Sequence, residues 1–189
     1  CKKQCKDKTI VFFKTKQLAH QTYLLFKFAG IEAAELHADL PQPDREKSVE
    51  QFTNGEVKVL LASDLAARGL DIQNIEYVIN FSIPSQIEQY IHRVGRTARN
   101  GKTGTAISFV CDTNEKNVQK KMIKHAVGPI VDMKISKELF QKALDIINKF
   151  EEKVQAELQK EEEERVKRAQ ENEIRRMKQL LDIEEEIPT

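Results

Sequence analysis

The chain has 189 residues, of which 32% are charged and 40% hydrophobic, with 7 Gly, 5 Pro and no Trp. This composition excludes collagen-like, proline-rich and disulfide-scaffold proteins. No apolar run approaches the ~18 residues of a membrane span. Three cysteines, Cys1, Cys5 and Cys111, are too few for a disulfide framework and are typical of a reducing compartment. Because the chain does not begin with Met, we expect it to be part of a longer protein.

The net charge of +1 conceals two parts of opposite charge. Residues 1–135 carry 20 Lys and Arg against 15 Asp and Glu, whereas residues 136–189 carry 11 against 15. Such a contrast indicates two physically different parts. We therefore predict a domain over residues 1–135 and a charge-rich helical extension over residues 136–189.

Strands and helices alternate along the first part. Apolar β-branched runs predict strands at 9–15, 31–37, 57–62, 76–81 and 104–111. Apolar residues at helical spacing predict helices at 16–29, 43–53, 85–93 and 114–126. Short, nearly continuous apolar strands between helices indicate an α/β fold, with a parallel sheet that helices cover on both faces. In such folds ligands lie at the carboxyl ends of the strands, so the polar loops there are the candidate functional segments.

The second part contains no Gly or Pro between residues 136 and 186. Apolar residues recur there every three or four positions and predict an amphipathic helix face of Phe140, Ala143, Ile147, Phe150 and Val154. Farther along, pairs such as Glu161–Arg165 and Glu164–Arg168 each stabilise a helix by about 0.2–0.5 kcal/mol. Two interpretations stay open: a solvated or partly disordered helical tail, and a helix that binds a partner or forms a coiled coil.

Three arginines follow the predicted helix at 85–93. Arg93, Arg96 and Arg99 are three residues apart, with His92 before them and Gly95 among them. Arginine is always charged, and its planar fork binds phosphate through two hydrogen bonds. The segment therefore indicates a phosphate site; the alternative is a basic surface turn whose charges are solvated.

A second polar segment follows the predicted strand at 57–62. It reads Ser63-Asp64-Leu65-Ala66-Ala67-Arg68-Gly69-Leu70-Asp71. A hydroxyl and turn amides can bind phosphate oxygens, and a carboxylate can accept hydrogen bonds from ribose hydroxyls. The alternative is a helix start capped by Asp64 and a turn at Gly69.

These two segments occur in the same order and spacing as motifs of a known family. Earlier in the chain stand Phe12-Phe13-Lys14-Thr15-Lys16, then Glu35-Leu36-His37, then Gln42 and Arg45. Together they resemble motifs IV to VI of DEAD-box RNA helicases, and the resemblance covers residues 9–111. It is to the second RecA-like domain of that family. The sequence Gly-Arg-Thr-Ala-Arg and the charged helical extension further resemble those of the nucleolar members that assemble the large ribosomal subunit.

The resemblance implies roles for individual residues. In the family, two RecA-like domains close over ATP, and RNA lies across both. The residues implied to contact ATP are Gly69, Asp71, Arg96 and Arg99, the last two as catalytic arginine fingers. Those implied to act between the domains are His92 and Arg93. Those implied to contact the RNA backbone are Thr15, Gln42, Arg45 and Ser63.

Two motifs of the family are absent from the sequence, the P-loop and the Asp-Glu-Ala-Asp box. Gly101-Lys102-Thr103 imitates the end of a P-loop, but Arg96 stands where Gly is needed, and a strand follows where a helix is needed. We therefore expect the Mg²⁺ ligands on an N-terminal RecA-like domain of the same protein and expect this chain alone to be inactive. We predict no metal site in this chain, because His20 and His125 have no ligand partner at metal spacing.

The resemblance also implies partners and a location. We expect single-stranded or structured pre-ribosomal RNA, the N-terminal RecA-like domain, an assembly factor for the helix at 136–186, a nucleolar location and no membrane. The alternatives are a RecA-like module that binds RNA or protein without catalysis, and an interaction protein in which that helix is the functional element. The phenylalanines Phe12, Phe13, Phe52, Phe81 and Phe109 are predicted to lie in the core rather than to stack on bases.

Overall fold

The structure is a computed structural model that describes residues 8–67, 72, 75–99, 101–110, 113–126 and 128–185. Five strands form one parallel sheet in the order β2-β3-β1-β4-β5. They are β1 (Thr9–Phe13), β2 (Ala33–Leu36), β3 (Val59–Ser63), β4 (Tyr77–Asn80) and β5 (Thr105–Ser108). The predicted α/β class and the five predicted strands are confirmed.

Helices separate the strands along the chain. They are α1 (Lys16–Phe28), α2 (Gln42–Asn54), α3 (Asp64–Ala67), α4 (Ile87–Val94), α5 (Thr113–His125) and α6 (Lys137–Glu185). The hydroxyl of Thr15 accepts a hydrogen bond from the Leu18 amide at 3.2 Å and caps α1. Gly55 ends α2 with φ of 77°, a left-handed conformation that glycine adopts without steric cost.

The sheet is covered on both faces, as the sequence predicts. Side chains alternate along β1, so that Ile10 and Phe12 face one layer and Val11 and Phe13 face the other. The first layer contains Phe52 of α2 together with the alanines of α3. The second layer contains Ala19, Leu18, Tyr23 and Phe26 of α1. All five β1 residues are buried, which makes β1 the central strand of the core.

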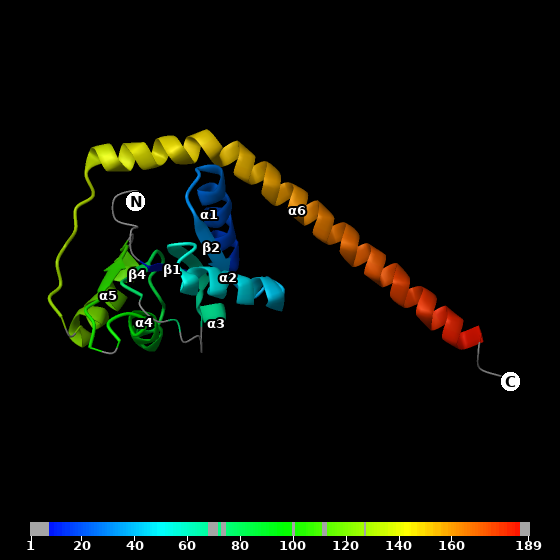
Figure 1. Ribbon diagram of the computed structural model, residues 1–189, viewed down its shortest axis with the longest axis horizontal. Coiled ribbons are helices and arrows are strands. Elements are labelled where there is room, and N and C mark those ends of the chain that lie inside the picture. Colours follow the sequence, from blue (N-terminus) through cyan, green and yellow to red (C-terminus); the bar gives the residue numbers. More distant parts are fainter. Residues whose placement is uncertain are drawn as a thin grey trace.

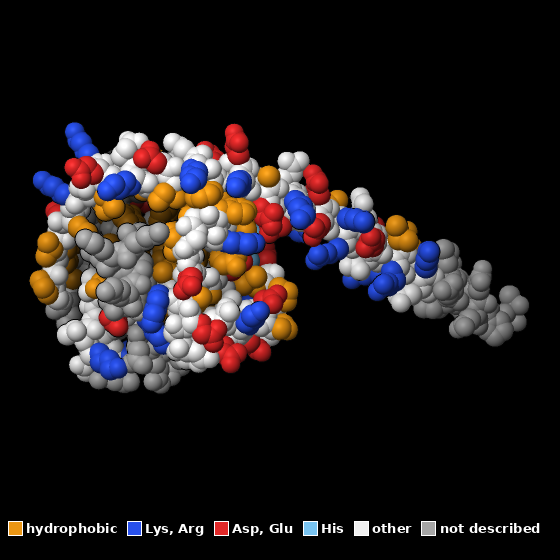
Figure 2. Space-filling view, turned by 45° about the horizontal axis from the view of Figure 1, so that its top comes forward, with side chains coloured by type: hydrophobic (Ala, Val, Ile, Leu, Met, Phe, Trp, Pro, Cys, Tyr) orange, Lys and Arg blue, Asp and Glu red, His pale blue; other side chains and the backbone are white. Residues whose placement is uncertain are grey.

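The long helix α6 crosses the outer side of α1 and then extends away from the domain (Figure 1). Val154 is its main anchor, with 3% of its surface exposed. Phe140 and Ile147 of the predicted apolar face remain 58% and 40% exposed. Charged side chains of both signs cover the extending half (Figure 2), and the predicted Glu164–Arg168 pair forms at 3.3 Å.

The ion pair predicted between Glu161 and Arg165 does not form. Arg165 instead pairs with Glu162 at 2.7 Å, three residues away. Glu161 lies 2.6 Å from His20 of α1. A contact with the folded domain therefore replaces a pair within the helix. In the part of the chain that the structure describes, none of the helices combines the length and the apolar character needed to cross a membrane.

Candidate functional site

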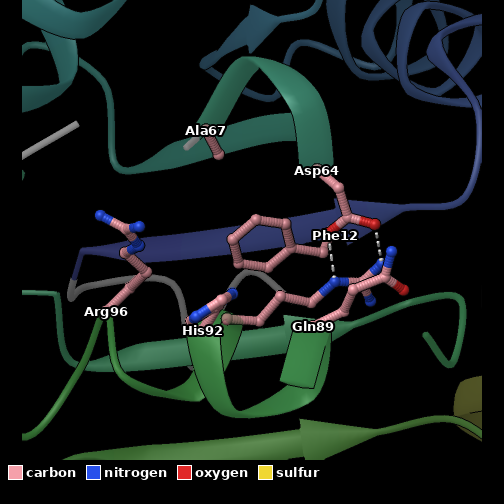
Figure 3. A pocket seen from close by; sticks show the side chains of 7 residues that line it. Phe12, Asp64, Ala67, Gln89, His92 and Arg96 are labelled. Carbon is pink, nitrogen blue, oxygen red and sulfur yellow. Dashed lines mark hydrogen bonds and ion pairs between the residues drawn. The ribbon is translucent and has the colours of Figure 1, made fainter. Parts of the chain in front are cut away.

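Arg93 organises the carboxyl edge of the sheet. It lies in the last turn of α4 with 3% of its surface exposed. Its Nε and Nη2 donate to the two carboxylate oxygens of Asp64 at 2.6 and 2.7 Å, a bidentate geometry (Figure 3). Its Nη1 donates to Asn80 Oδ1 at 3.1 Å and to the Ser82 carbonyl at 2.7 Å. One guanidinium thus joins the ends of β3 and β4 to α4.

The surroundings of Arg93 extend this network through the sheet. Its guanidinium lies 5.1 Å from the centre of the Phe12 ring, within the range of cation–π attraction. Asn80 is fully buried and donates to the Ser108 hydroxyl at 3.0 Å. The carboxylate of Asp64, considered from sequence as a helix cap, is instead bound by Arg93. The predicted interdomain role of Arg93 stays a prediction, since these contacts all lie within one domain.

A small pocket opens beside this network. Its volume is about 20 Å³, and it is lined by Phe12, Asp64, Ala67, Gln89, His92, Arg93 and Arg96. In Figure 3, Arg96 rises beside the Phe12 ring, away from the Arg93–Asp64 pair. The structure therefore brings His92, Arg93 and Arg96 of the arginine segment to one pocket with Asp64, at the carboxyl ends of β1 and β3. This is the edge at which the sequence predicts ligand binding.

Thr97 fixes the backbone between the two predicted arginine fingers. It is 5% exposed, and its hydroxyl lies 2.5 Å from the Ile75 carbonyl oxygen and 3.2 Å from that of Glu76. Ala98 follows in a left-handed conformation with φ of 54°, which is uncommon for a residue other than glycine. Arg99 donates from Nε to the Gly95 carbonyl at 2.7 Å. The buried threonine therefore holds the turn from which Arg96 and Arg99 project.

Gly104 has no side chain, and the Thr97 side chain fills the space beside it. A Cβ atom on Gly104 would lie 2.1 Å from Thr97 Oγ1 and 2.7 Å from the Ala98 nitrogen. We predict that Gly104→Ala lowers the free energy of unfolding by about 1–3 kcal/mol, the usual cost of overpacking. Urea denaturation of the chain measures this loss.

Gly128→Ala is the matched control. The φ of Gly128 is not positive, and a methyl group added there would meet no atom of the described residues within 4 Å. We expect its effect to stay within about 0.5 kcal/mol, as for open surface sites. Equal stabilities of the two variants would contradict the packing of Gly104 against Thr97.

The residues implied to contact RNA lie on the ends of β1, β3 and α2. Phe13 of β1 is in register with Ser63 of β3, and Thr15 lies two residues after Phe13. The two hydroxyl residues therefore lie at neighbouring strand ends. Ser63 is 8% exposed, which leaves little of its surface for a ligand. Gln42 donates to Glu46 at 2.7 Å and accepts from Arg45 at 3.3 Å. The enclosed Nε of Arg45 has no hydrogen-bond partner within the described part of the chain.

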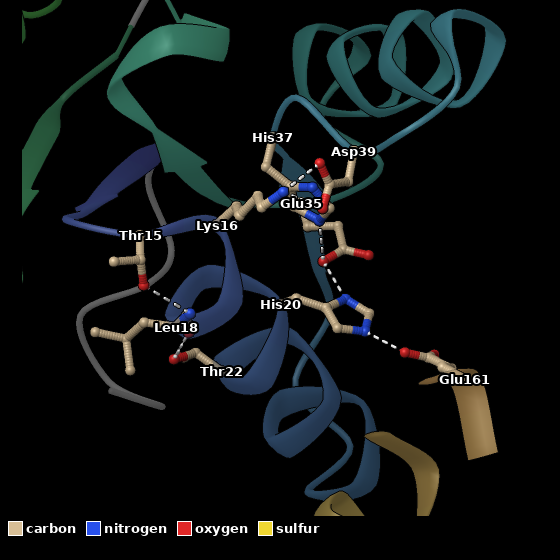
Figure 4. Close-up of polar contacts among 9 residues, drawn as sticks. All are labelled: Thr15, Lys16, Leu18, His20, Thr22, Glu35, His37, Asp39 and Glu161. Atoms are coloured by element: carbon tan, nitrogen blue, oxygen red, sulfur yellow. Dashed lines mark hydrogen bonds and ion pairs between the residues drawn. The ribbon is translucent and has the colours of Figure 1, made fainter. Parts of the chain in front are cut away.

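Sequence reasoning missed a polar cluster of His20, Glu35 and His37 between α1 and the end of β2. Glu35 Oε2 lies 2.8 Å from His20 Nδ1 and 3.2 Å from His37 Nε2 (Figure 4). The second ring nitrogen of His20 meets Glu161 of α6 at 2.6 Å. The prediction that His20 has no ligand-type partner is therefore wrong. The members of the cluster come from α1 and the end of β2, and Glu161 lies 141 residues after His20. Their spacing in the sequence therefore gave no sign of the cluster.

The cluster shifts the pKa values of its members. The hydrogen bond to Glu35 raises the pKa of His20 to about 9 against the opposing effect of burial, and Glu161 adds to the rise. Burial would raise the pKa of Glu35, but its hydrogen bonds with His20 and His37 outweigh burial and lower it. His20 and Glu35 therefore form a charged pair that fastens α1 to β2.

Gly69 and Asp71, predicted to contact ATP, lie outside the described residues. The turn at Gly101 has φ of 75° and leads into β5, as predicted from its place before a strand. The roles assigned from the resemblance to Thr15, Gln42, Arg45, Ser63, His92, Arg96 and Arg99 stay predictions. The structure adds the placement of Thr15, Ser63, His92 and Arg96 at the carboxyl edge of the sheet, and of Gln42 and Arg45 in the first turn of α2. Arg99 lies just past Thr97, which pairs with Ile75 before β4.

The chain is similar to known helicases. The family described as "Helicase conserved C-terminal domain" matches residues 1–101. The "DEAD-box ATP-dependent RNA helicase 28" of Arabidopsis thaliana is 40% identical over 187 residues, covering 99% of this chain and 24% of that protein. The "ATP-dependent RNA helicase DRS1" of Pyricularia oryzae is 38% identical over 195 residues, with 99% and 24% covered. The chain thus spans about a quarter of the length of these curated relatives.

A solved structure shows the same fold. Domain 2 of the DEAD-box helicase Mss116p, bound to an RNA duplex, superposes with a TM-score of 0.63 at 27% identity, over 77% of this chain and 59% of that one. The parallel sheet, the arginine segment after α4 and the family match agree with one another. The chain belongs to the helicase conserved C-terminal domain family, with the RecA-like fold of the second domain of DEAD-box helicases.

Proposed function

We propose that this chain is the C-terminal half of an ATP-dependent RNA helicase. The observation that carries the proposal is the anchored arginine segment. Arg93 is bound by Asp64 at the carboxyl edge, and Thr97 is bound to the Ile75 carbonyl just before β4, so the turn that carries Arg96 and Arg99 is anchored on both sides. A half-site of this kind works when an N-terminal RecA-like domain brings ATP to that edge.

In this proposal the arginines act at the phosphates. Arg96 and Arg99 bind the γ-phosphate as the domains close and neutralise the charge that develops during phosphoryl transfer. Gly69 and Asp71 contact the nucleotide, and His92 with Arg93 transmits closure between the domains. Mg²⁺ is held by the N-terminal domain, where it offsets phosphate charge.

RNA crosses the same edge in this proposal. Thr15, Gln42, Arg45 and Ser63 bind its phosphates, and contacts of this type carry little sequence information. Arg45 and Gln42 are hydrogen-bonded neighbours in the first turn of α2, which supports a joint contact with one phosphate. We expect RNA binding that is largely independent of sequence.

The finer setting is also a proposal. The sequence Gly-Arg-Thr-Ala-Arg and the charged helical extension, which resemble the nucleolar members of the family, favour a role in pre-ribosomal RNA remodelling in the nucleolus. We propose residues 1–135 as the RecA-like domain and 136–189 as the extension, since α5 ends at His125 and α6 begins at Lys137. The exposed end of α6 is then the place for an assembly-factor partner.

Replacing Arg45 tests the RNA surface. In the full-length protein, Arg45→Ala should weaken binding to single-stranded RNA and reduce the slope of log affinity against log salt by about 0.7, the value for one lost phosphate contact. Lys47→Ala on the same helix is the matched control, because it removes an exposed charge without a proposed contact. Fluorescence anisotropy at several salt concentrations measures both slopes. If the two variants lose the same slope and affinity, Arg45 has no specific place in the RNA site.

A further inference from the structure

Three metal-ligand side chains converge between α1 and β2. Glu35 and His37 are two residues apart on an extended segment, so both project to the same side of the sheet, toward His20 of α1. Their ligand atoms all lie within 4.8 Å of one another. Figure 4 shows the His20 and Glu35 side chains meeting in the space between the two elements.

The spacing is close to that of a tetrahedral metal site. Zinc bonds of 2.0–2.1 Å place neighbouring ligand atoms roughly 3.3 Å apart. Glu35 Oε2 lies 2.8 Å from His20 Nδ1 and 3.2 Å from His37 Nε2, so the ion requires only a small separation of these groups. Two imidazoles and one carboxylate are a ligand set that zinc adopts in proteins, with the fourth position open to water.

The cluster is enclosed by the fold. Glu35 is 8% and His37 is 6% exposed, and a carboxylate is rarely this buried unless it is paired. The Nδ1 atom of His37 is buried and has no hydrogen-bond partner among the described residues. The other ring nitrogen, Nε2, faces Glu35 and is the His37 atom that would meet an ion.

Helix α6 supplies an outer contact. Glu161 Oε2 lies 2.6 Å from His20 Nε2, the ring nitrogen opposite the one that faces Glu35. Metal-binding histidines commonly donate their second N–H to a carboxylate, which fixes the ring and raises its basicity. Glu161 stands in that position, although it lies 141 residues away in the sequence.

We propose that His20, Glu35 and His37 bind one divalent transition metal ion of the zinc class. His20 binds through Nδ1, His37 through Nε2 and Glu35 through Oε2, while Glu161 orients His20 from α6. The ion replaces the protons that the two imidazoles share with Glu35. It fastens α6 and α1 to the end of β2, four residues before Pro41 starts the turn into α2. The site does not depend on the proposed helicase function.

Metal binding to the 189-residue chain tests the proposal. Co²⁺ is added to the metal-free chain and followed by visible absorption, and zinc content is measured after dialysis against Zn²⁺. We expect one ion per chain and displacement of Co²⁺ by Zn²⁺. His37→Gln and Glu35→Gln should abolish the absorption. His125→Gln, on exposed α5, is the matched control and should leave it unchanged.

Glu161→Gln provides a variant that keeps the domain intact. The Glu161 side chain is 44% exposed, so this change leaves the core untouched, and we expect affinity for Co²⁺ to fall by about 10–100-fold. Absorption and zinc content that persist in His37→Gln and Glu35→Gln would overturn the proposal. Failure of the unaltered chain to retain zinc would overturn it as well.

Discussion

Arg99→Ala in the full-length protein is expected to reduce RNA-stimulated ATP turnover by about 10³-fold or more. Arginine fingers are worth about 10³–10⁵ in rate in related nucleotide hydrolases, because they neutralise charge in the transition state. RNA affinity without nucleotide should change little, since the finger acts on ATP. Steady-state phosphate release and RNA anisotropy, measured on the same protein, separate these two effects.

Two further variants sharpen this result. Arg99→Lys keeps the charge but loses the planar fork, so we expect it to recover only part of the rate. Lys120→Ala removes an exposed charge from α5 and should turn over ATP like the unaltered protein. Normal turnover in Arg99→Ala would show that the arginine segment serves binding alone and would favour a non-catalytic RNA-binding module.

Asp64→Asn should destabilise the chain by about 3 kcal/mol. The substitution keeps the shape of Asp64 but leaves the buried Arg93 guanidinium without its counter-charge, and breaking such pairs costs about 3–5 kcal/mol. The lower end applies, because the Asp64 side chain is 28% exposed and Arg93 keeps its bonds to Asn80 and Ser82. Urea denaturation measures the loss.

An exposed ion pair gives the control for Asp64. Glu164→Gln removes the partner of Arg168 on α6, where the side chains are 51% and 76% exposed. Exposed helical pairs contribute about 0.3–0.5 kcal/mol, so this variant should be nearly neutral. If Asp64→Asn is equally neutral, the Arg93 network does not hold the site together.

The sheet could be predicted because each strand is a short apolar run, and β1 and β3 are buried throughout as such runs imply, whereas β5 at the edge is exposed or half-buried. The carboxyl-end rule then placed Asp64 and Arg93 on the same edge, and the structure joins them at 2.6 Å. The partners of Thr97 could not be predicted in this way. Its contacts with Ile75 and Gly104 depend on how a loop returns to the sheet, and periodicity carries no information about that path.

Two phenylalanines predicted for the core lie at the surface instead. Phe81 and Phe109 are 44% and 37% exposed, and each follows the last paired residue of its strand. Their rings lie 6.0 Å apart at the open edge, where they contact each other. Apolar composition predicted the strands correctly. It does not tell which strand ends a helix covers; α5, for example, packs on α4.

The path of α6 was also beyond sequence reasoning. The apolar spacing predicts one continuous face, yet the structure buries Val154 and leaves Phe140 exposed. The direction of the helix is set by α1 and by the contact between His20 and Glu161, residues far apart in the sequence. A helical pattern predicts which side chains share a face and leaves open which part of that face meets the domain.

The central claim is that this chain is half of an ATP-hydrolysing site. The most direct test compares RNA-stimulated ATP turnover of the 189-residue chain with that of the same chain joined to its own N-terminal domain. We predict no turnover by the chain alone and turnover by the joined protein that rises when RNA is added. Turnover by the chain alone, or a joined protein that stays inert with single-stranded and structured RNA, would contradict the account.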